Sequence, residues 1–259
     1  MIKNNNILVL GSKIGSNLPA IEVSKIYTSN GAAQKAKYYK DHNKNVDHTA
    51  IVGGKYIMEF EDEKQRVINS KPNKLIVRSG PIDVPKEFKS YECKILQLTK
   101  KEDFKIQSKF YKLGFLDLVY GEIIHYETSL IERLKHTYIC IKHKGFMGYS
   151  TGLMAVLLAV YENPDANIFV SGIGLIEGPR FFENKSDYGY VSKTKTKLIN
   201  NKKIILKNKF NNTSRFRVDR YLAKSLKNIY KKRIISLDKD FVNNAFGSLW
   251  KGKVLKNNY

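Results

Sequence analysis

Two short runs of small and hydroxylated residues carry the clearest chemical signal in this chain. The run Tyr149-Ser150-Thr151-Gly152 precedes the apolar stretch 153–161, and the run Ser171-Gly172-Ile173-Gly174 follows the apolar stretch 168–170. This pattern predicts a helix that begins at the first run and a buried strand that ends at the second. Backbone N–H groups at a helix start attract anions, and ligands of open α/β sheets bind past the carboxyl ends of the strands. We therefore expect these residues to bind a phosphorylated ligand.

Two earlier turns have the same character. Gly11-Ser12-Lys13 follows the apolar run 6–10, and Asn30 follows the run 25–29. The GxxxxGK[ST] spacing of a P-loop is absent from the first turn. Because the carboxyl ends of parallel strands share one edge of a sheet, these turns should meet the later runs there. The predicted binding residues are Gly11, Ser12, Lys13, Asn30, Ser150, Thr151, Gly152, Ser171, Gly172 and Gly174.

Short apolar runs alternate with helical patterns along most of the chain. This alternation predicts an α/β fold, a Rossmann-like and mostly parallel sheet flanked by helices, in a single domain over 1–259. A polar, Lys-rich segment at about 177–212 has little periodicity, and we expect it to be a lid. The expected strands are 6–10, 25–29, 48–52, 75–77, 95–98, 168–170 and 233–237, and the expected helices are 32–39, 56–68, 123–134, 153–161, 217–230 and 241–250.

The chain is strongly basic. Its 46 Lys and Arg residues against 24 Asp and Glu residues give a net charge of +22 over 259 residues. Such a charge favours anionic partners, which include a sugar nucleotide, anionic lipid and nucleic acid. A basic surface without a specific partner is the alternative interpretation. No recognisable RNA-binding motif interleaves aromatic and basic residues, which argues against nucleic acid.

The cysteines and the first residues of the chain predict the cellular location of the protein. Cys93 and Cys140 lie in apolar runs without metal-ligand spacing, which is typical of reduced core residues in a cytoplasmic protein. Residues 1–6 lead directly into a predicted strand, so we expect no signal peptide. The longest apolar stretch, 153–161, is too short to span a bilayer. The expected location is cytoplasmic, with peripheral contact at the inner membrane as an option.

The segment 145–178 resembles the donor-binding half of sialyltransferases. Bacterial members have a Thr/Ser-Ser/Thr-Gly turn, a hydrophobic helix and a strand ending in Ser-Gly-Ile, similar to Ser150-Thr151-Gly152 and Ser171-Gly172-Ile173. Animal-type members have a later Gly-Phe-Gly, which is close to Gly172-Ile173-Gly174. The resemblance implies a CMP-linked sugar donor, held by both pieces.

The resemblance extends more weakly along the chain. The family's Gly-Asn-Gly-like turn at the nucleotide phosphates matches Gly11-Ser12-Lys13, and its donor-contacting Asn matches Asn30. A Lys-rich helix, a strand and a short helix close the family fold, and 224–250 has this order. The resemblance thus implies a Rossmann-like sheet with a lid over the donor. It also implies no essential metal.

The chain departs from the family at the catalytic positions. The family's histidine base falls at about Ser214 or Arg215, and no histidine follows His143. Ile176 and Phe182 stand where bacterial members have tyrosines, and Gly148 stands where they have an arginine before the Thr/Ser turn. Since an arginine stays protonated at neutral pH, Arg215 cannot replace the imidazole as a base.

Other residues must therefore carry the chemistry. We predict that Arg180 and Arg215 stabilise the departing CMP phosphate and that Glu177 or Glu183 deprotonates the acceptor hydroxyl. The remaining candidates for the base are Asp187, His125, His136 and His143.

These inferences lead to an inverting glycosyltransferase as the first hypothesis. Its donor would be CMP-sialic acid, with CMP-Kdo as the alternative, and its acceptor a glycan or lipid-linked glycan. A non-catalytic, basic Rossmann-like protein that binds nucleic acid or anionic membrane surfaces is the hypothesis from another class. Selective CMP binding separates the first hypothesis from the second.

Overall fold

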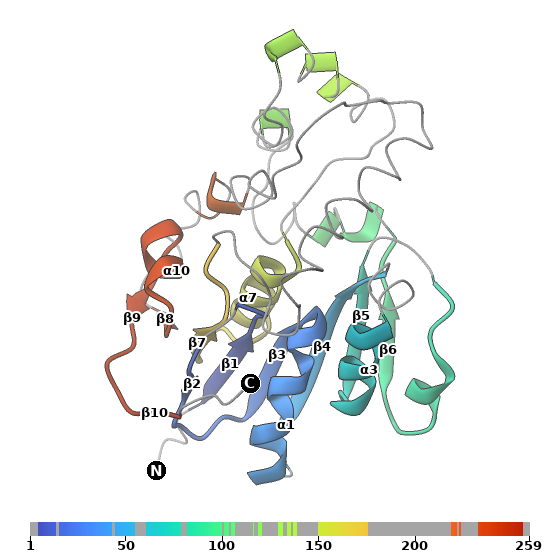
Figure 1. The fold of residues 1–259 in the computed structure, drawn as a ribbon, viewed down its shortest axis with the longest axis vertical. Helices are drawn as coiled ribbons and strands as arrows, with labels where there is room; N and C mark the ends of the chain where they lie inside the picture. Colours follow the sequence, from blue (N-terminus) through green and yellow to red (C-terminus); the bar gives the residue numbers. More distant parts are fainter. Residues whose placement is uncertain are drawn as a thin grey trace.

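The structure, a computed structural model, is built on an eight-stranded sheet with the strand order β6-β5-β4-β3-β1-β7-β8-β9. Every pair of neighbouring strands in it is parallel. This confirms the predicted α/β class with a Rossmann-like, mostly parallel sheet flanked by helices (Figure 1). The structure describes residues 5–13, 16–42, 45–54, 61–78, 82–99, 101–103, 105–106, 116, 119–120, 129–131, 134–135, 137–138, 150–175, 219–221, 223 and 233–255.

The strands of the first half follow the apolar runs of the sequence. They are β1 (Asn6–Leu10), β3 (Lys25–Ser29), β4 (Asp47–Gly53), β5 (Lys74–Arg78) and β6 (Lys94–Gln97). The bounds of β1 and β3 agree with the prediction, and those of the others differ by one residue at each end. Parallel strands buried on both faces are mostly apolar, although β3 and β4 also bury Thr28, Ser29, His48 and Thr49.

Helices cover both faces of this sheet. In Figure 1, α1 (Ala33–His42) and α3 (Glu61–Asn69) lie in front of the strands and α7 (Thr151–Glu162) lies behind them. A 3₁₀ turn, η1 (Asn30–Ala32), precedes α1. The nearly continuous apolar sequence of α7 agrees with its position, because its residues 153–160 are all buried. This helix is the central element of the back layer.

The core alternates along each strand between the two helical layers. In β1, Ile7 and Val9 belong to the cluster that contains α7, whereas Leu8 and Leu10 belong to the cluster that contains Ala36 of α1. Successive side chains of a strand point to opposite faces, so a strand between two layers of helices buries both of its faces, and β1 is apolar from Ile7 to Leu10. The same alternation fixes the register of β1 against β3 and β7.

The C-terminal part completes the other half of the sheet. It contains β7 (Asn167–Ser171), β8 (Ile234–Ser236), α10 (Lys239–Asn244) and β9 (Ser248–Leu249). The prediction of one helix over 241–250 is wrong beyond Asn244. Gly247 has a φ of 104°, and residues 248–249 pair in parallel with β8. A small antiparallel pair, β2 (Leu18–Pro19) with β10 (Val254–Leu255), was not predicted.

Several predictions fall wholly or partly outside the described residues. The lid at 177–212 and Cys140 lie outside them, whereas Cys93 is half-buried just before β6. Within the predicted helices 123–134 and 217–230, the described residues 130, 131, 134, 219–221 and 223 are helical, whereas Ser129 is not. Among the helices of the described residues, none has the length and apolar character needed to cross a membrane.

Candidate functional site

The strand order reverses direction at the junction of β1 and β7. From β1 the chain continues through β3, β4, β5 and β6 on one side of the sheet, and β7, β8 and β9 add on the other side. Ligands of open α/β sheets bind at such a switch point, beyond the carboxyl ends of the strands. The predicted turns Gly11-Ser12-Lys13 and Ser171-Gly172 both lie at this junction, directly after β1 and at the end of β7.

The two turns are in direct backbone contact. The N–H of Gly11 donates to the carbonyl oxygen of Ser171 at 2.7 Å, and the N–H of Lys13 donates to that of Gly172 at 2.9 Å. A Cβ atom on Gly11 would lie 2.2 Å from the Gly172 oxygen, and one on Gly172 would lie 2.3 Å from the Gly11 oxygen. Only glycine permits this approach at both positions. The pairing of β1 and β7 therefore continues past the ends of both strands.

Two carboxylates that follow β8, those of Asp238 and Asp240, contact residues of this junction. Asp238 accepts a hydrogen bond from the N–H of Gly172 at 2.6 Å through Oδ2, and its Oδ1 lies 3.5 Å from Lys13 Nζ. Lys13 Nζ also lies 2.6 Å from Asp240 Oδ2. Partial burial acts to lower the pKa of Lys13, but the hydrogen bond to Asp240 and the charge of Asp238 together raise it. Lys13 is thus a paired cation at the edge.

A buried lysine of α1 contacts the turn that follows β1. Lys35 of α1 is almost fully buried and donates at 2.9 Å both to the carbonyl oxygen of Gly11 and to Ser16 Oγ. Burial lowers the pKa of Lys35 to about 8, and the charge of Asp238 opposes that shift. These two hydrogen bonds tie α1 to the turn that follows β1.

The start of α7 is capped twice. Ser150 is its N-cap residue, and the Ser150 Oγ accepts from the N–H of Leu153 at 3.2 Å. The N–H of Ser150 itself donates to Oδ1 of Asp219 at 2.8 Å, and Asp219 is fully buried. Thr151 and Gly152 are the first residues of the helix, so their N–H groups have no acceptor within it. These two hydrogen bonds fix the orientation of the helix start.

This helix start touches the turn after β7. A Cβ atom on Gly152 would lie 3.6 Å from Cγ2 of Ile173, which is ordinary van der Waals contact. Ile173 follows Gly172, which touches Gly11. The predicted pieces around residues 11, 152 and 172 are therefore contiguous in space although they are far apart in the sequence. Further along, the carbonyl oxygen of Gly174 accepts from Asn244 Nδ2 at 3.5 Å.

Asn30 and Ser171 serve the fold through their side chains. Asn30 has a φ of 50°, and its Oδ1 accepts from the N–H of Gly53 at 3.2 Å, which ties the end of β3 to that of β4. The hydroxyl of Ser171 donates to the carbonyl oxygen of Asn17 at 2.5 Å. Since Leu10 pairs with Thr28, Asn30 lies at the strand end next to the Gly11 turn.

The predicted catalytic residues lie outside the described part of the chain. They are Glu177, Arg180, Glu183 and Arg215, with Asp187, His125, His136 and His143 as the alternatives. Conversely, the sequence reasoning missed four charged residues at the edge: Lys35, Asp219, Asp238 and Asp240. Asp238 directly follows the predicted strand 233–237. The rule that ligands bind where parallel strands end, which selected Asn30, therefore applied to Asp238 as well; we call it the strand-end rule. Lys35 and Asp219 lie in helical patterns and had no such signal.

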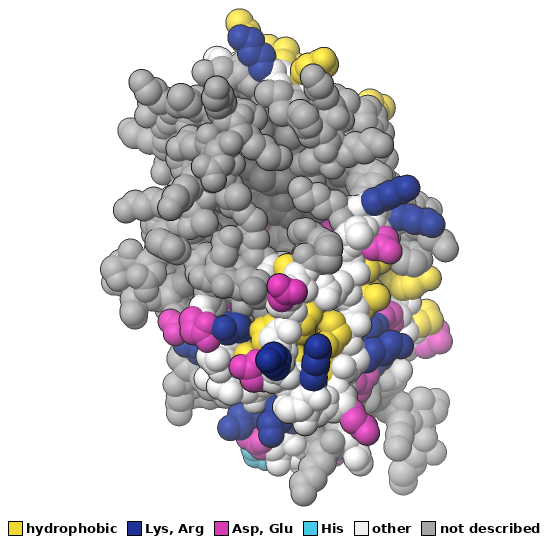
Figure 2. Space-filling view, turned by 90° about the vertical axis from the view of Figure 1, so that its right-hand side faces the viewer, with side chains coloured by type: hydrophobic (Ala, Val, Ile, Leu, Met, Phe, Trp, Pro, Cys, Tyr) yellow, Lys and Arg dark blue, Asp and Glu magenta, His cyan; other side chains and the backbone are white. Residues whose placement is uncertain are grey.

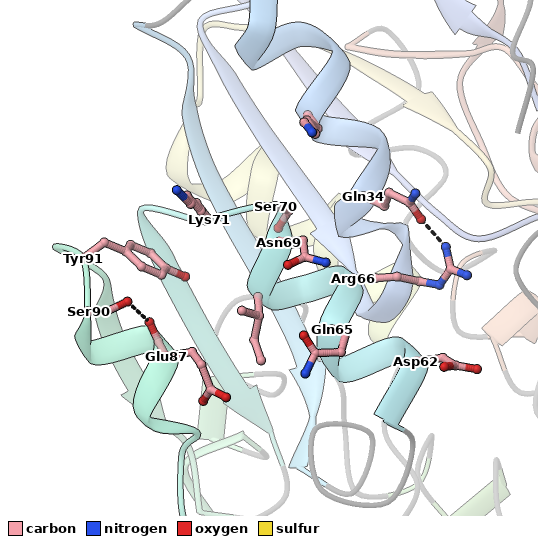
Figure 3. Close-up of a pocket in the computed structure, with 12 residues that line it drawn as sticks. Gln34, Asp62, Gln65, Arg66, Asn69, Ser70, Lys71, Glu87, Ser90 and Tyr91 are labelled. Carbon is pink, nitrogen blue, oxygen red and sulfur yellow. Dashed lines mark hydrogen bonds between the residues drawn. The ribbon is translucent and has the colours of Figure 1, made fainter.

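A separate open groove of about 730 Å³ lies between α1, α3 and the 3₁₀ turn η2 (Lys86–Lys89). Figure 3 shows its polar lining, in which Arg66 hydrogen-bonds Gln34 and the hydroxyl of Ser90 bonds the Glu87 carbonyl oxygen. Basic and acidic side chains are mixed along it, and its lining includes none of the turns that follow β1 and β7. The carboxyl edge is therefore the better candidate site.

Comparisons with known proteins add no relative. No family model, no curated protein and no solved structure matches this chain. Among the described residues, no group of three or more His, Cys, Asp or Glu side chains is placed to hold a metal ion.

Proposed function

We propose that this chain is an inverting glycosyltransferase that transfers sialic acid from CMP-sialic acid to a glycan acceptor, with CMP-Kdo as the alternative donor. The observation that carries the proposal is the contiguity of the Gly11 turn, the Gly172 turn and the capped start of α7 at the switch point of the sheet. These are the segments whose sequences resemble the donor-binding half of sialyltransferases. The net charge of +22 favours an anionic ligand, which includes a sugar nucleotide.

The reaction needs a base, a nucleophile and a stabilised leaving group. The base takes the proton of an acceptor hydroxyl, the oxygen attacks the anomeric carbon, and the bond from that carbon to the phosphate oxygen breaks to release CMP. The described carboxylates Asp219, Asp238 and Asp240 each accept a hydrogen bond from a neighbouring group of the fold. We therefore keep Glu177 or Glu183 as the proposed base and Arg180 and Arg215 as the proposed cations for the phosphate.

Nucleotide binding is the first test. Calorimetry should find that CMP binds and that UMP and GMP bind more weakly. The Thr151→Val variant should weaken CMP binding about tenfold, because one hydrogen bond contributes about 1–1.5 kcal/mol. Thr151→Ser, which retains the hydroxyl, should bind like the wild type. Equal CMP affinity in all three proteins would remove the Thr151 hydroxyl from the site.

Turnover is the second test. Release of CMP from CMP-sialic acid and from CMP-Kdo should be measured with a panel of glycan acceptors. The net charge of +22 also favours the class of basic binding proteins without catalysis. No turnover with either donor, together with tight and salt-sensitive RNA binding in place of CMP binding, would establish that alternative.

A further inference from the structure

Exposed apolar side chains gather at one end of the molecule, away from the core. Residues 130, 131, 134, 135, 137 and 138 are helical. Leu130, Ile131, Leu134 and Tyr138 are exposed by 64 %, 66 %, 50 % and 64 %, whereas Thr137 is buried. In the ribbon, these helical residues lie at the upper end, on the side toward which the carboxyl ends of the strands point (Figure 1). We call the surface formed by Leu130, Ile131, Leu134 and Tyr138 the apical face.

The apical face has the periodicity of an amphipathic helix turned outward. Leu130, Leu134 and Tyr138 are spaced four residues apart in the sequence. At about 100° per residue of a helix, these three positions and Ile131 fall within an arc of about 100°. An apolar face of this kind normally packs on a core, and here it is exposed to solvent. Isolated apolar side chains on a surface need no explanation, but a contiguous group of them marks a surface for contact.

The positive charge near the apical face favours a partner surface that is negatively charged. Lys135 is exposed beside the apical face, and Figure 2 shows basic and hydrophobic side chains together at the upper end of the molecule. The sequence around it, 129–144, has Arg133, Lys135, Lys142 and Lys144 against the single acid Glu132. The whole chain has a net charge of +22. Exposed Leu, Ile and Tyr side chains on helical residues, in a stretch of sequence rich in Lys and Arg, are typical of binding in the plane of an anionic membrane interface.

We propose that the apical face docks this protein on the surface of a membrane rich in anionic lipid. The apolar side chains enter the boundary between headgroups and acyl chains, and Lys135 lies at the level of the phosphates. The contact is peripheral. It turns the carboxyl edge of the sheet toward the membrane, so a lipid-linked acceptor would be on the correct side. The proposal is independent of the proposed reaction, because it requires no donor.

Partition onto vesicles tests the proposal directly. The full chain should sediment with vesicles of phosphatidylglycerol and much less with vesicles of phosphatidylcholine. The double variant Ile131→Asn/Leu134→Asn should lower the partition coefficient at least about tenfold, because each buried aliphatic side chain contributes more than a factor of ten when fully inserted. Leu96→Asn is the matched control, since Leu96 is an exposed apolar side chain on the edge strand β6. It should leave partition unchanged.

Charge and depth give two further measurements. Lys135→Glu should weaken partition about fivefold or more at low salt and less at high salt, whereas Lys251→Glu, at an exposed lysine near the C-terminus, should have a smaller effect. Leu134→Trp retains an apolar side chain and reports depth. Its fluorescence should shift to the blue on phosphatidylglycerol vesicles and be quenched by brominated acyl chains, unlike that of Leu96→Trp.

Defined results would overturn the proposal. They are equal sedimentation of the wild type with both kinds of vesicle, unchanged partition of the double variant, or no quenching of Leu134→Trp. A wild-type dimer in solution that the double variant converts to a monomer, with vesicle binding unaltered, would instead identify the apical face as an interface between two copies of the chain.

Discussion

Replacement of Gly172 by alanine tests whether the β1–β7 junction depends on two backbones in contact. A methyl group on Gly172 would lie 2.3 Å from the carbonyl oxygen and 2.7 Å from the carbonyl carbon of Gly11, and 3.1 Å from Ser16 Oγ. The nearest of these atoms belong to backbone, so the clash cannot be relieved by turning a side chain. The φ of 77° at Gly172 is also in the left-handed region. The alanine variant therefore meets two separate penalties.

The size of the effect follows from these penalties. A left-handed conformation costs a residue with a Cβ atom roughly 1–2 kcal/mol. An added methyl group in a packed region costs typically about 1–3 kcal/mol. Gly172→Ala should therefore lower the free energy of unfolding by about 2–5 kcal/mol, which is a large part of the roughly 5–15 kcal/mol of an ordinary domain.

Gly152→Ala is the matched control. The added Cβ atom would lie 3.6 Å from Cγ2 of Ile173, which is ordinary contact, and Gly152 is in the first turn of α7. Alanine is preferred to glycine inside a helix by about 1 kcal/mol, so this variant should be as stable as the wild type or slightly more stable. Urea unfolding followed by circular dichroism gives both values. A loss of less than about 1 kcal/mol in Gly172→Ala, or an equal loss in both variants, would refute the close contact.

Three further predictions concern charged residues. Asp219→Ala should lower the free energy of unfolding by about 1–3 kcal/mol, because the N–H of Ser150 loses its acceptor; it should also weaken CMP binding in calorimetry, and Asp219→Asn should rescue both properties. Glu177→Gln or Glu183→Gln should reduce turnover at least about a hundredfold with CMP affinity nearly intact, because a base acts mainly in the transition state. Full turnover in both glutamine variants would transfer the role of base to another residue. Burial lowers the pKa of Lys35 from 10.5 to about 8, so the unfolded chain holds this proton more strongly. The contribution of Lys35 to the free energy of unfolding should therefore rise with pH between about 8 and 10.5, and it can be followed up to about pH 9.5. The rise should be about 1–2 kcal/mol larger in the wild type than in Lys35→Met, and identical pH profiles would show that Lys35 is not buried as a charge.

Local sequence was sufficient for most of the sheet. The bounds of β1 and β3 agree with the prediction, because strands buried on both faces are rich in apolar, aromatic and β-branched residues and end at Gly or Asn turns. The helix over 241–250 failed where long-range pairing determines the structure, since residues 248–249 join β8 across the turn at Gly247. The pair of β2 with β10 also joins two-residue segments far apart in the sequence, which no local pattern reveals.

The strand-end rule predicted the backbone turns of the candidate site, but it did not predict all the side chains that contact them. It identified the turns at Gly11 and Gly172, which the structure brings into contact. It did not identify Lys35, which reaches the carbonyl oxygen of Gly11 from a helix 24 residues away. Nor did it identify Asp219, which holds the N–H of Ser150 from 69 residues away. Such contacts depend on how the helices pack on the sheet, and the apolar periodicity of a helix does not predict which of its polar side chains reaches a particular strand end.

The junction also determines which backbone groups are available to a phosphate. Rossmann-like dinucleotide sites bind the pyrophosphate at the first turn between strand and helix. In this chain the N–H groups of Gly11 and Lys13 donate to carbonyl oxygens of the β7 turn, so that first turn is committed to the fold. The N–H groups of Thr151 and Gly152 begin α7 and have no acceptor within it, and this helix start lies against the turn after β7. We therefore expect the donor phosphate at the start of α7. Changes at residues 151–152 should then alter affinity, whereas changes at Gly11 and Gly172 should alter stability.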